Sequence, residues 1–141
     1  MYLILRAGEY LFFLAFSSSF SAKLADTFGS EIGKRWGRKT YLITNFRSVP
    51  AGTDGAISLE GTFASFGGSL LMGLIMYKLY FLTSFISLSI VVISGFIATL
   101  MESYFGALFQ DRIPWISNEL VNFFQTIFAA IISILLAVIL L

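Results

Sequence analysis

Cysteine and histidine are both absent from the 141-residue chain. Without cysteine there is no disulfide or thiol chemistry, and without histidine the chain lacks the usual general base and the commonest zinc ligand. Charge is also scarce, because only 12% of the residues are charged, about half the share typical of a soluble domain. The net charge of +1 offers no electrostatic footprint for nucleic acid, so we expect no nucleic-acid partner. Any chemistry must therefore use carboxylates, amides, hydroxyls and a few cations.

Apolar side chains, in contrast, are abundant: 57% of the residues are hydrophobic and the mean hydropathy is +0.88. A soluble fold of this length could not bury that much apolar surface, whereas a lipid bilayer solvates it. Uncharged runs at 61–77, 79–101 and 120–141 supply the ~20 apolar residues that cross a bilayer. We therefore predict an all-α integral membrane bundle of about four transmembrane helices, forming a single domain over residues 1–141. The predicted helices cover residues 2–25, 59–81, 83–110 and 117–141.

The first predicted span has the weakest signal, since only thirteen uncharged residues separate Glu9 from Lys23. A cleaved signal peptide is the alternative; small residues at 19–22 fit it, but no positive cluster precedes them. A polar connection at about 32–58 follows and is rich in cations, which are Lys34, Arg35, Arg38, Lys39 and Arg47. With four alternating helices, Lys23 and Arg112 lie on the same side of the membrane as this connection, whereas Arg6 and Lys78 lie on the opposite side. The positive-inside rule then places the basic connection on the cytoplasmic or stromal side, and topology alone accounts for such a cluster.

Small residues recur every four positions along the second predicted helix, at Gly61, Ser65, Ser69 and Gly73. Residues four apart share one face of a helix. A stripe of small residues lets two helix backbones approach closely. We interpret this stripe as a packing face.

Polar side chains recur at helical spacing in the other three predicted helices. Asp26 and Glu31 end the first, Glu102 lies near the end of the third, and Asn118 and Asn122 open the fourth. Because successive helices alternate in direction, we expect these side chains to converge at one membrane surface beside the basic connection. Carboxylates there suit a metal ion and a polyphosphate. The alternatives are an interfacial Glu102 that snorkels to water and amides that hold the helices together.

A glycine turn precedes the second predicted helix, in the segment Val-Pro-Ala-Gly-Thr-Asp-Gly-Ala-Ile-Ser at 49–58. Gly52 and Gly55 permit positive φ and a close approach of the backbone to a ligand. Ser58 or Thr62 can cap the helix that follows, and a helix N-terminus favours an anion. The segment is thus a candidate phosphate site, although Pro and Gly also punctuate ordinary turns in this way.

These motifs together resemble an integral membrane family that includes plant phytyl-phosphate kinase. The resemblance rests on Ala25-Asp26-Thr27, Ser30-Glu31, Gly33, Ile43-Thr44, the glycine turn, Glu102-Ser103, Gly106-Ala107, Gln110, Asn118 and Val121-Asn122. More distantly, the Asp-Thr pair and the turn are similar to CTP-dependent polyprenol kinases and CDP-diglyceride synthetases. Two departures stand out: Glu102 replaces an aspartate of the family, and family members carry a longer N-terminal portion. We therefore expect the chain to match the C-terminal part of a longer member. Three alternatives follow: the chain is a fragment, a further membrane subunit supplies the rest as a partner, or the chain is a reduced relative.

The resemblance implies a prenyl-phosphate kinase of a plastid or cyanobacterial membrane, which transfers a phosphoryl group, with CTP as donor, to a membrane-embedded prenyl monophosphate. It implies Mg²⁺ as cofactor, with Asp26, Glu31 and Glu102 as catalytic and metal-binding residues. The implied substrate- and phosphate-binding residues are Ser30, Arg47, Pro50, Gly52, Thr53, Asp54, Gly55, Ser58, Gln110, Asn118 and Asn122. One alternative is a small transporter that uses intramembrane carboxylates, which predicts helices interrupted near mid-membrane. The other is a non-catalytic subunit of a larger membrane complex.

Overall fold

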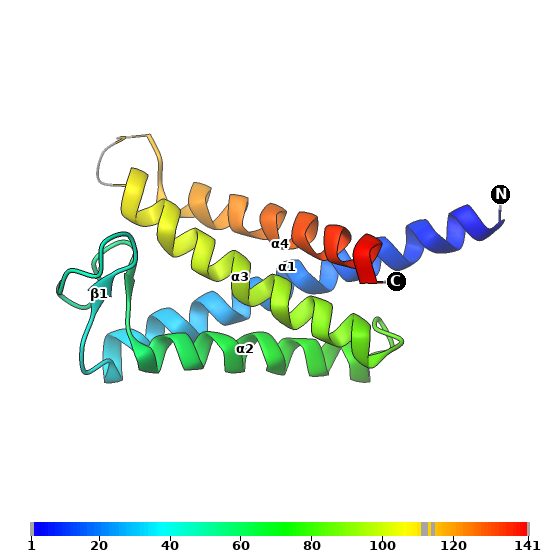
Figure 1. The fold of residues 1–141 in the computed structure, drawn as a ribbon, viewed down its shortest axis with the longest axis horizontal. Helices are drawn as coiled ribbons and strands as arrows, with labels where there is room; N and C mark the ends of the chain where they lie inside the picture. Colours follow the sequence, from blue (N-terminus) through cyan, green and yellow to red (C-terminus); the bar gives the residue numbers. More distant parts are fainter. Residues whose placement is uncertain (1, 111–112, 114, 141) are drawn as a thin grey trace.

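The computed structural model describes the backbone of residues 2–110, 113 and 115–140, and the side chains of this set from residue 7 onward. Helices dominate it: α1 (Tyr2–Trp36), α2 (Leu59–Lys78), α3 (Phe85–Phe109) and α4 (Asn118–Leu140). They run alternately in opposite directions, so the two termini lie towards one end of the bundle and the α1–α2 connection lies at the other (Figure 1). The predicted all-α fold is confirmed.

Three of the described helices, α2, α3 and α4, are long and apolar enough to cross a membrane. They correspond to the second, third and fourth predicted spans, and Leu141, the last residue of the fourth, lies outside the described residues. A membrane span within α1 stays a prediction. So does the sidedness of the basic connection; of the cations that supported it, Arg112 and the side chain of Arg6 also lie outside the described part of the chain.

Helix α1 is longer than predicted, because it continues to Trp36 instead of ending near residue 25. The prediction ended the helix where charged residues begin, but a helix need not end at the edge of a membrane. No proline lies between Asp26 and Trp36, and Lys34 and Arg35 in the last turn complement the helix dipole. The polar connection therefore begins at residue 37, and Asp26 is held on a regular helix.

The connection from residue 37 to residue 58 folds into an ordered lobe over this end of the bundle (Figure 1). Strands β1 (Tyr41–Leu42) and β2 (Ala56–Ile57) pair antiparallel, with Tyr41 opposite Ile57. The backbone N–H of Ile43 extends the pairing by donating to the carbonyl of Gly55 at 3.0 Å. The lobe thereby fixes the position of the glycine turn relative to the helices.

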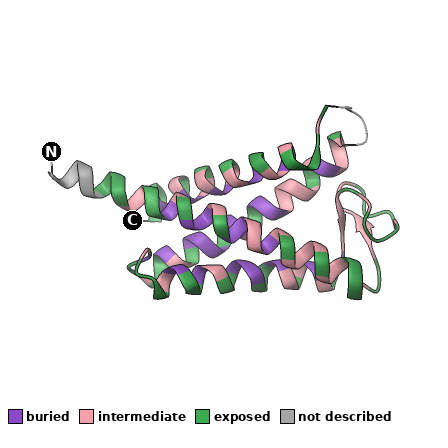
Figure 2. Ribbon diagram, turned by 180° about the vertical axis from the view of Figure 1, so that it is seen from behind, coloured by how far each residue is buried: buried purple, intermediate pink, exposed green. Residues whose placement is uncertain are grey.

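Helices α1 and α2 pack through small residues. The predicted stripe of Gly61, Ser65, Ser69 and Gly73 is buried, which confirms it as a packing face. On α1, a Cβ added at Gly29 would clash with the hydroxyl of Ser65. Burial runs along the facing sides of the helices, while their outer faces are exposed (Figure 2).

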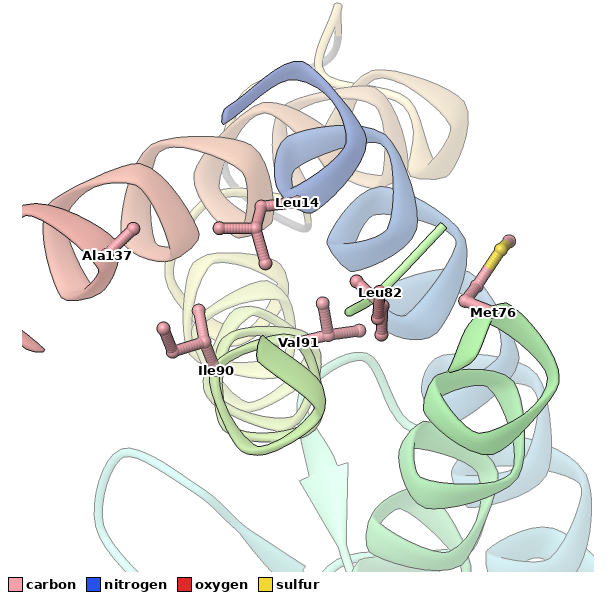
Figure 3. Close-up of a cluster of buried hydrophobic side chains, with 6 residues drawn as sticks. All are labelled: Leu14, Met76, Leu82, Ile90, Val91 and Ala137. Atoms are coloured by element: carbon pink, nitrogen blue, oxygen red, sulfur yellow. The ribbon is translucent and has the colours of Figure 1, made fainter. Parts of the chain in front are cut away.

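At the end of the bundle away from the lobe, large apolar side chains from all four helices and the α2–α3 turn meet in a core. Figure 3 shows this cluster, which comprises Leu14, Met76, Leu82, Ile90, Val91 and Ala137. The middle of the bundle is narrower and is filled by Ala22, Ala98 and Ala129. Both α2 and α3 are continuous helices, so the mid-membrane interruptions that the transporter alternative requires are not seen in the described helices.

Candidate functional site

A polar cavity of about 420 Å³ lies at the lobe end of the bundle, between α1, α2, α3 and the lobe. Most of the predicted site residues line it, although they come from five separate parts of the chain. They are Asp26, Ser30, Gly52, Thr53, Asp54, Gly55, Ser58, Glu102, Gln110 and Asn118. The structure thus brings together the residues that the alternating helices were expected to gather, and their chemical roles stay a prediction.

Asp26 is held in place by a lysine from the preceding turn of α1. The ammonium of Lys23 donates to Oδ2 of Asp26 at 3.0 Å and to Oδ1 of Asn122 on α4 at 2.7 Å. The Asp26 side chain is 20% exposed, so its carboxylate is partly withdrawn from solvent but reaches the cavity. Asn122 does not line the cavity, and its observed role is to anchor Lys23.

Glu102 reaches the cavity from α3, three positions after Thr99, which also lines it. At the end of α3 the amide of Gln110 donates from Nε2 to Oδ1 of Asn118 at 3.3 Å. This bond links the end of α3 to the start of α4, and both residues line the cavity. The two helices therefore present a carboxylate and two amides to the same space.

The glycine turn adopts the backbone that its sequence predicts, with φ of +91° at Gly52 and +73° at Gly55. A Cβ built on Gly55 would lie 2.7 Å from Cα of Ala107, so only glycine lets the lobe rest directly on α3. Ser58 caps α2 as predicted, because its Oγ accepts from the N–H of Gly61 at 3.0 Å. The capped N-terminus of α2 lines the cavity, where it favours an anion.

Three further predicted residues lie away from the cavity. The side chain of Glu31 is 71% exposed and lies 3.9 Å from the ammonium of Lys34. Five residues separate Glu31 from Asp26, which turns it by about 140° around the helix. Arg47 is exposed on the lobe, and Pro50 supports the turn by accepting from the hydroxyl of Thr53 at 2.8 Å. The structure therefore does not bring Glu31 into the cavity with Asp26 and Glu102.

A buried polar network lies between α1, α3 and α4, as in the alternative in which amides of the fourth predicted helix hold the helices together. The amide of Gln125 donates from Nε2 to the carbonyl of Ala22 at 3.2 Å and to Oγ1 of Thr99 at 3.0 Å. Its Oε1 accepts from Lys23 at 3.4 Å. The spacings were available as a signal, because Lys23 precedes Asp26 by three residues and Gln125 follows Asn122 by three. What the spacings could not give is that the two helices face each other here.

The donor set of the cavity suits Mg²⁺. Sites that bind Mg²⁺ with a substrate phosphate use one or two carboxylates and several waters. Asp26 and Glu102 line the cavity and would supply these carboxylates, and Asp54 of the turn lines it as well. The described residues contain no group of three acidic, histidine or cysteine side chains that could hold a metal ion. A metal ion here would therefore need ligands from the substrate or from water as well.

Comparison with known proteins places this arrangement in a family. Residues 2–130 match the family described as integral membrane protein DUF92. The chain belongs to this family. DUF92 membership covers all the elements that line the cavity, and it agrees with the apolar helices in assigning the chain to a membrane.

The chain is also similar to individual proteins from three different organisms. The chain is 44% identical over 121 residues to the uncharacterized membrane protein sll0875 of Synechocystis, and the match covers 86% of this chain and 46% of that one. It is 42% identical over 132 residues to protein VTE6, chloroplastic, of Arabidopsis thaliana, covering 92% of this chain and 39% of the relative. Identity to the uncharacterized membrane protein MJ0933 of Methanocaldococcus jannaschii is 40% over 124 residues, covering 87% and 50%.

The chain thus spans half or less of the length of these curated relatives. No solved structure matches it.

Proposed function

We propose that the chain is a prenyl-phosphate kinase, which transfers the γ-phosphoryl group of a nucleoside triphosphate to a prenyl monophosphate embedded in the membrane. The observation that carries the proposal is the polar cavity, in which Asp26, Glu102 and the glycine turn face one another at one end of an apolar bundle. The motif resemblance to the family of phytyl-phosphate kinase supplies the chemistry, and we favour phytyl phosphate as acceptor and CTP as donor. The chloroplastic and Synechocystis relatives support a plastid or cyanobacterial membrane. The positive-inside rule favours the stromal or cytoplasmic side for the basic lobe.

In the proposed reaction an oxygen of the prenyl phosphate attacks the γ-phosphorus, a new P–O bond forms, and the bond to the β–γ bridging oxygen breaks. The products are the prenyl diphosphate and the nucleoside diphosphate. The attacking oxygen is already anionic, so the step needs alignment and neutralisation of charge more than it needs a general base. This requirement suits a chain that has no histidine.

The cavity supplies groups for both tasks. Backbone N–H groups of the glycine turn and the capped N-terminus of α2 bind phosphate oxygens. Lys34 lines the cavity and neutralises charge, while Gln110 and Asn118 orient the nucleotide or the acceptor. Lys23 keeps the carboxylate of Asp26 in position. Asp26 and Glu102 would hold Mg²⁺, whose charge would favour the developing negative charge on the transferred group.

The test is an assay in lipid vesicles that contain the chain, CTP labelled at the γ-phosphate and phytyl phosphate. We expect labelled phytyl diphosphate. Asp26→Asn and Glu102→Gln should each lower the rate by about 100-fold or more, the scale expected when a group that stabilises charge in the transition state is removed. The amount of protein inserted into the membrane should be the same for both variants as for the native chain.

Glu31→Gln is the matched control, because it changes the same functional group on the same helix outside the cavity. We expect its rate to stay within about twofold of the native rate, as for other exposed polar changes. Equal turnover by the native chain, Asp26→Asn and Glu102→Gln would end the proposal. Absence of turnover together with copurification of a larger membrane protein would favour the alternative of a non-catalytic subunit.

A further inference from the structure

A second hollow, of about 440 Å³, lies between α3 and α4. Aromatic rings from both helices and from their connection form most of its wall, including Phe105, Phe124 and Phe128. The rings of Phe105 and Phe128 are stacked across the two helices, with centroids 5.5 Å apart and planes inclined by 9°. Glu102 and Gln125 are the polar side chains among the described residues that line this α3–α4 groove.

The groove and the polar cavity meet at Glu102, which lines both. Along α3, Ser103 and Gln110 face the cavity, whereas Phe105 and Phe109 face the groove. Glu102 lies on the boundary between these two faces of one helix. An anionic head in the cavity and an apolar tail in the groove would therefore lie on two sides of the same residue.

Two other sides of the cavity are closed. Between α1 and α2 the backbones are in contact, since a Cβ added at Gly61 would lie 2.8 Å from the carbonyl oxygen of Gly29. Towards the bundle centre, Gln125 and Thr99 close the space by hydrogen bonding to each other and to the carbonyl of Ala22.

We propose that the α3–α4 groove binds the hydrocarbon tail of the phosphorylated lipid acceptor, with its phosphate beside Glu102 in the cavity. This assignment rests on the proposed function, because the acceptor is the molecule that must carry a phosphate and a tail at once. The volume of the groove lies within the range of about 300–1,000 Å³ that is usual for small-molecule sites. A wall made of apolar atoms fits a single hydrocarbon chain.

Photo-crosslinking tests the location directly. A phytyl phosphate analogue with a diazirine in the middle of its tail is irradiated with the native chain in phosphatidylcholine vesicles, without nucleotide. We expect label on peptides within residues 105–128, and we expect unlabelled phytyl phosphate to compete while phytol does not. Label on α1 and α2, label spread evenly over the helices, or label that phytyl phosphate does not remove would overturn the proposal.

A pair of neighbouring phenylalanines on α4 gives a matched kinetic test. Phe124 lines the groove and is 46% exposed, whereas Phe123 is 59% exposed and does not line it. Phe124→Ala should raise the KM for phytyl phosphate by about tenfold, on the scale of a lost contact in an apolar pocket. The KM for dimethylallyl phosphate, whose tail is too short to fill the groove, should not change.

Phe123→Ala should leave both constants within about twofold of the native values, as expected for an outward-facing side chain. The rings of Phe123 and Phe124 touch each other, with centroids 5.9 Å apart, so both variants lose that contact and their difference reports the groove. Equal effects of the two variants would overturn the groove assignment. Groove labelling without any turnover would instead contradict the kinase and leave a lipid-phosphate site, whereas turnover with label elsewhere would contradict the groove alone.

Discussion

The two long seams of the bundle are built from opposite kinds of side chain. Where α1 meets α2, glycine and serine face one another, and a Cβ added at Gly68 would lie 2.7 Å from the carbonyl oxygen of Leu24. Where α3 meets α4 near the lobe, phenylalanines face one another and a groove of about 440 Å³ remains. The first seam is closed, whereas the second is open.

The difference follows from how helices associate in lipid. Lipid tails are as apolar as leucine, so helices gain little by hiding apolar surface and depend on close packing and interhelical hydrogen bonds. Small residues bring the α1 and α2 backbones together, and Ser21 adds a hydrogen bond to the Ser69 hydroxyl at 2.7 Å. Large rings keep α3 and α4 apart where they stack. We infer that the closed seam is the scaffold and that the open one is available to a ligand.

The largest effect is expected from filling the closed seam. Gly68→Ala should lower the free energy of unfolding by about 3 kcal/mol, at the upper end of the cost of overpacking, because the obstructing atom is backbone and cannot rotate away. Equilibrium unfolding in mixed micelles measures it.

Gly67→Ala is the control at the adjacent position, where an added Cβ meets nothing within 4 Å. It should be neutral, or stabilising by up to about 1 kcal/mol through helix propensity. If the two alanine variants were equally stable, close packing of α1 on α2 would not be what holds this seam.

A smaller effect is expected at the open seam. Phe128→Leu keeps an apolar side chain but removes the ring that stacks on Phe105, so the unfolding free energy should fall by about 1.5 kcal/mol or less. Phe123→Leu removes a ring that is 59% exposed and touches Phe124, so its effect should be smaller than that of Phe128→Leu. If Phe128→Leu lowered the unfolding free energy as much as Gly68→Ala, the contrast between the two seams would be contradicted.

Much of this fold could be predicted because its signals are local. Uncharged runs of sufficient length gave α2, α3 and α4, the four-residue spacing of small residues gave the packing face of α2, and Ser58 was recognisable as a cap. Alternation of helix direction was enough to bring Asp26, Glu102 and the turn to one end.

What failed depended on helix phase and on tertiary packing. The end of α1 was misplaced because charged residues, which mark the end of a membrane span, were assumed to mark the end of the helix as well. Glu31 was grouped with Asp26 by proximity in sequence, although the helix carries it to another face. The groove could not be foreseen, since it depends on which phenylalanines of α3 and α4 meet.

The smallest effect is expected where α1 joins the α3–α4 pair. Gln125→Leu removes a buried amide that bonds to Ala22 and Thr99, yet the Thr99 hydroxyl still donates to the Ala22 carbonyl at 3.2 Å. Interhelical hydrogen bonds in membranes contribute about 0.6 kcal/mol on average, so the unfolding free energy should fall by about that amount. Lys23 keeps its bonds to Asp26 and Asn122, so phosphoryl transfer should change little.

Ser133→Ala is the control, because the Ser133 hydroxyl donates within α4, to the carbonyl of Ala130. A loss for Gln125→Leu several times that of Ser133→Ala, with transfer abolished, would show that polar bonding matters more than packing where these helices meet.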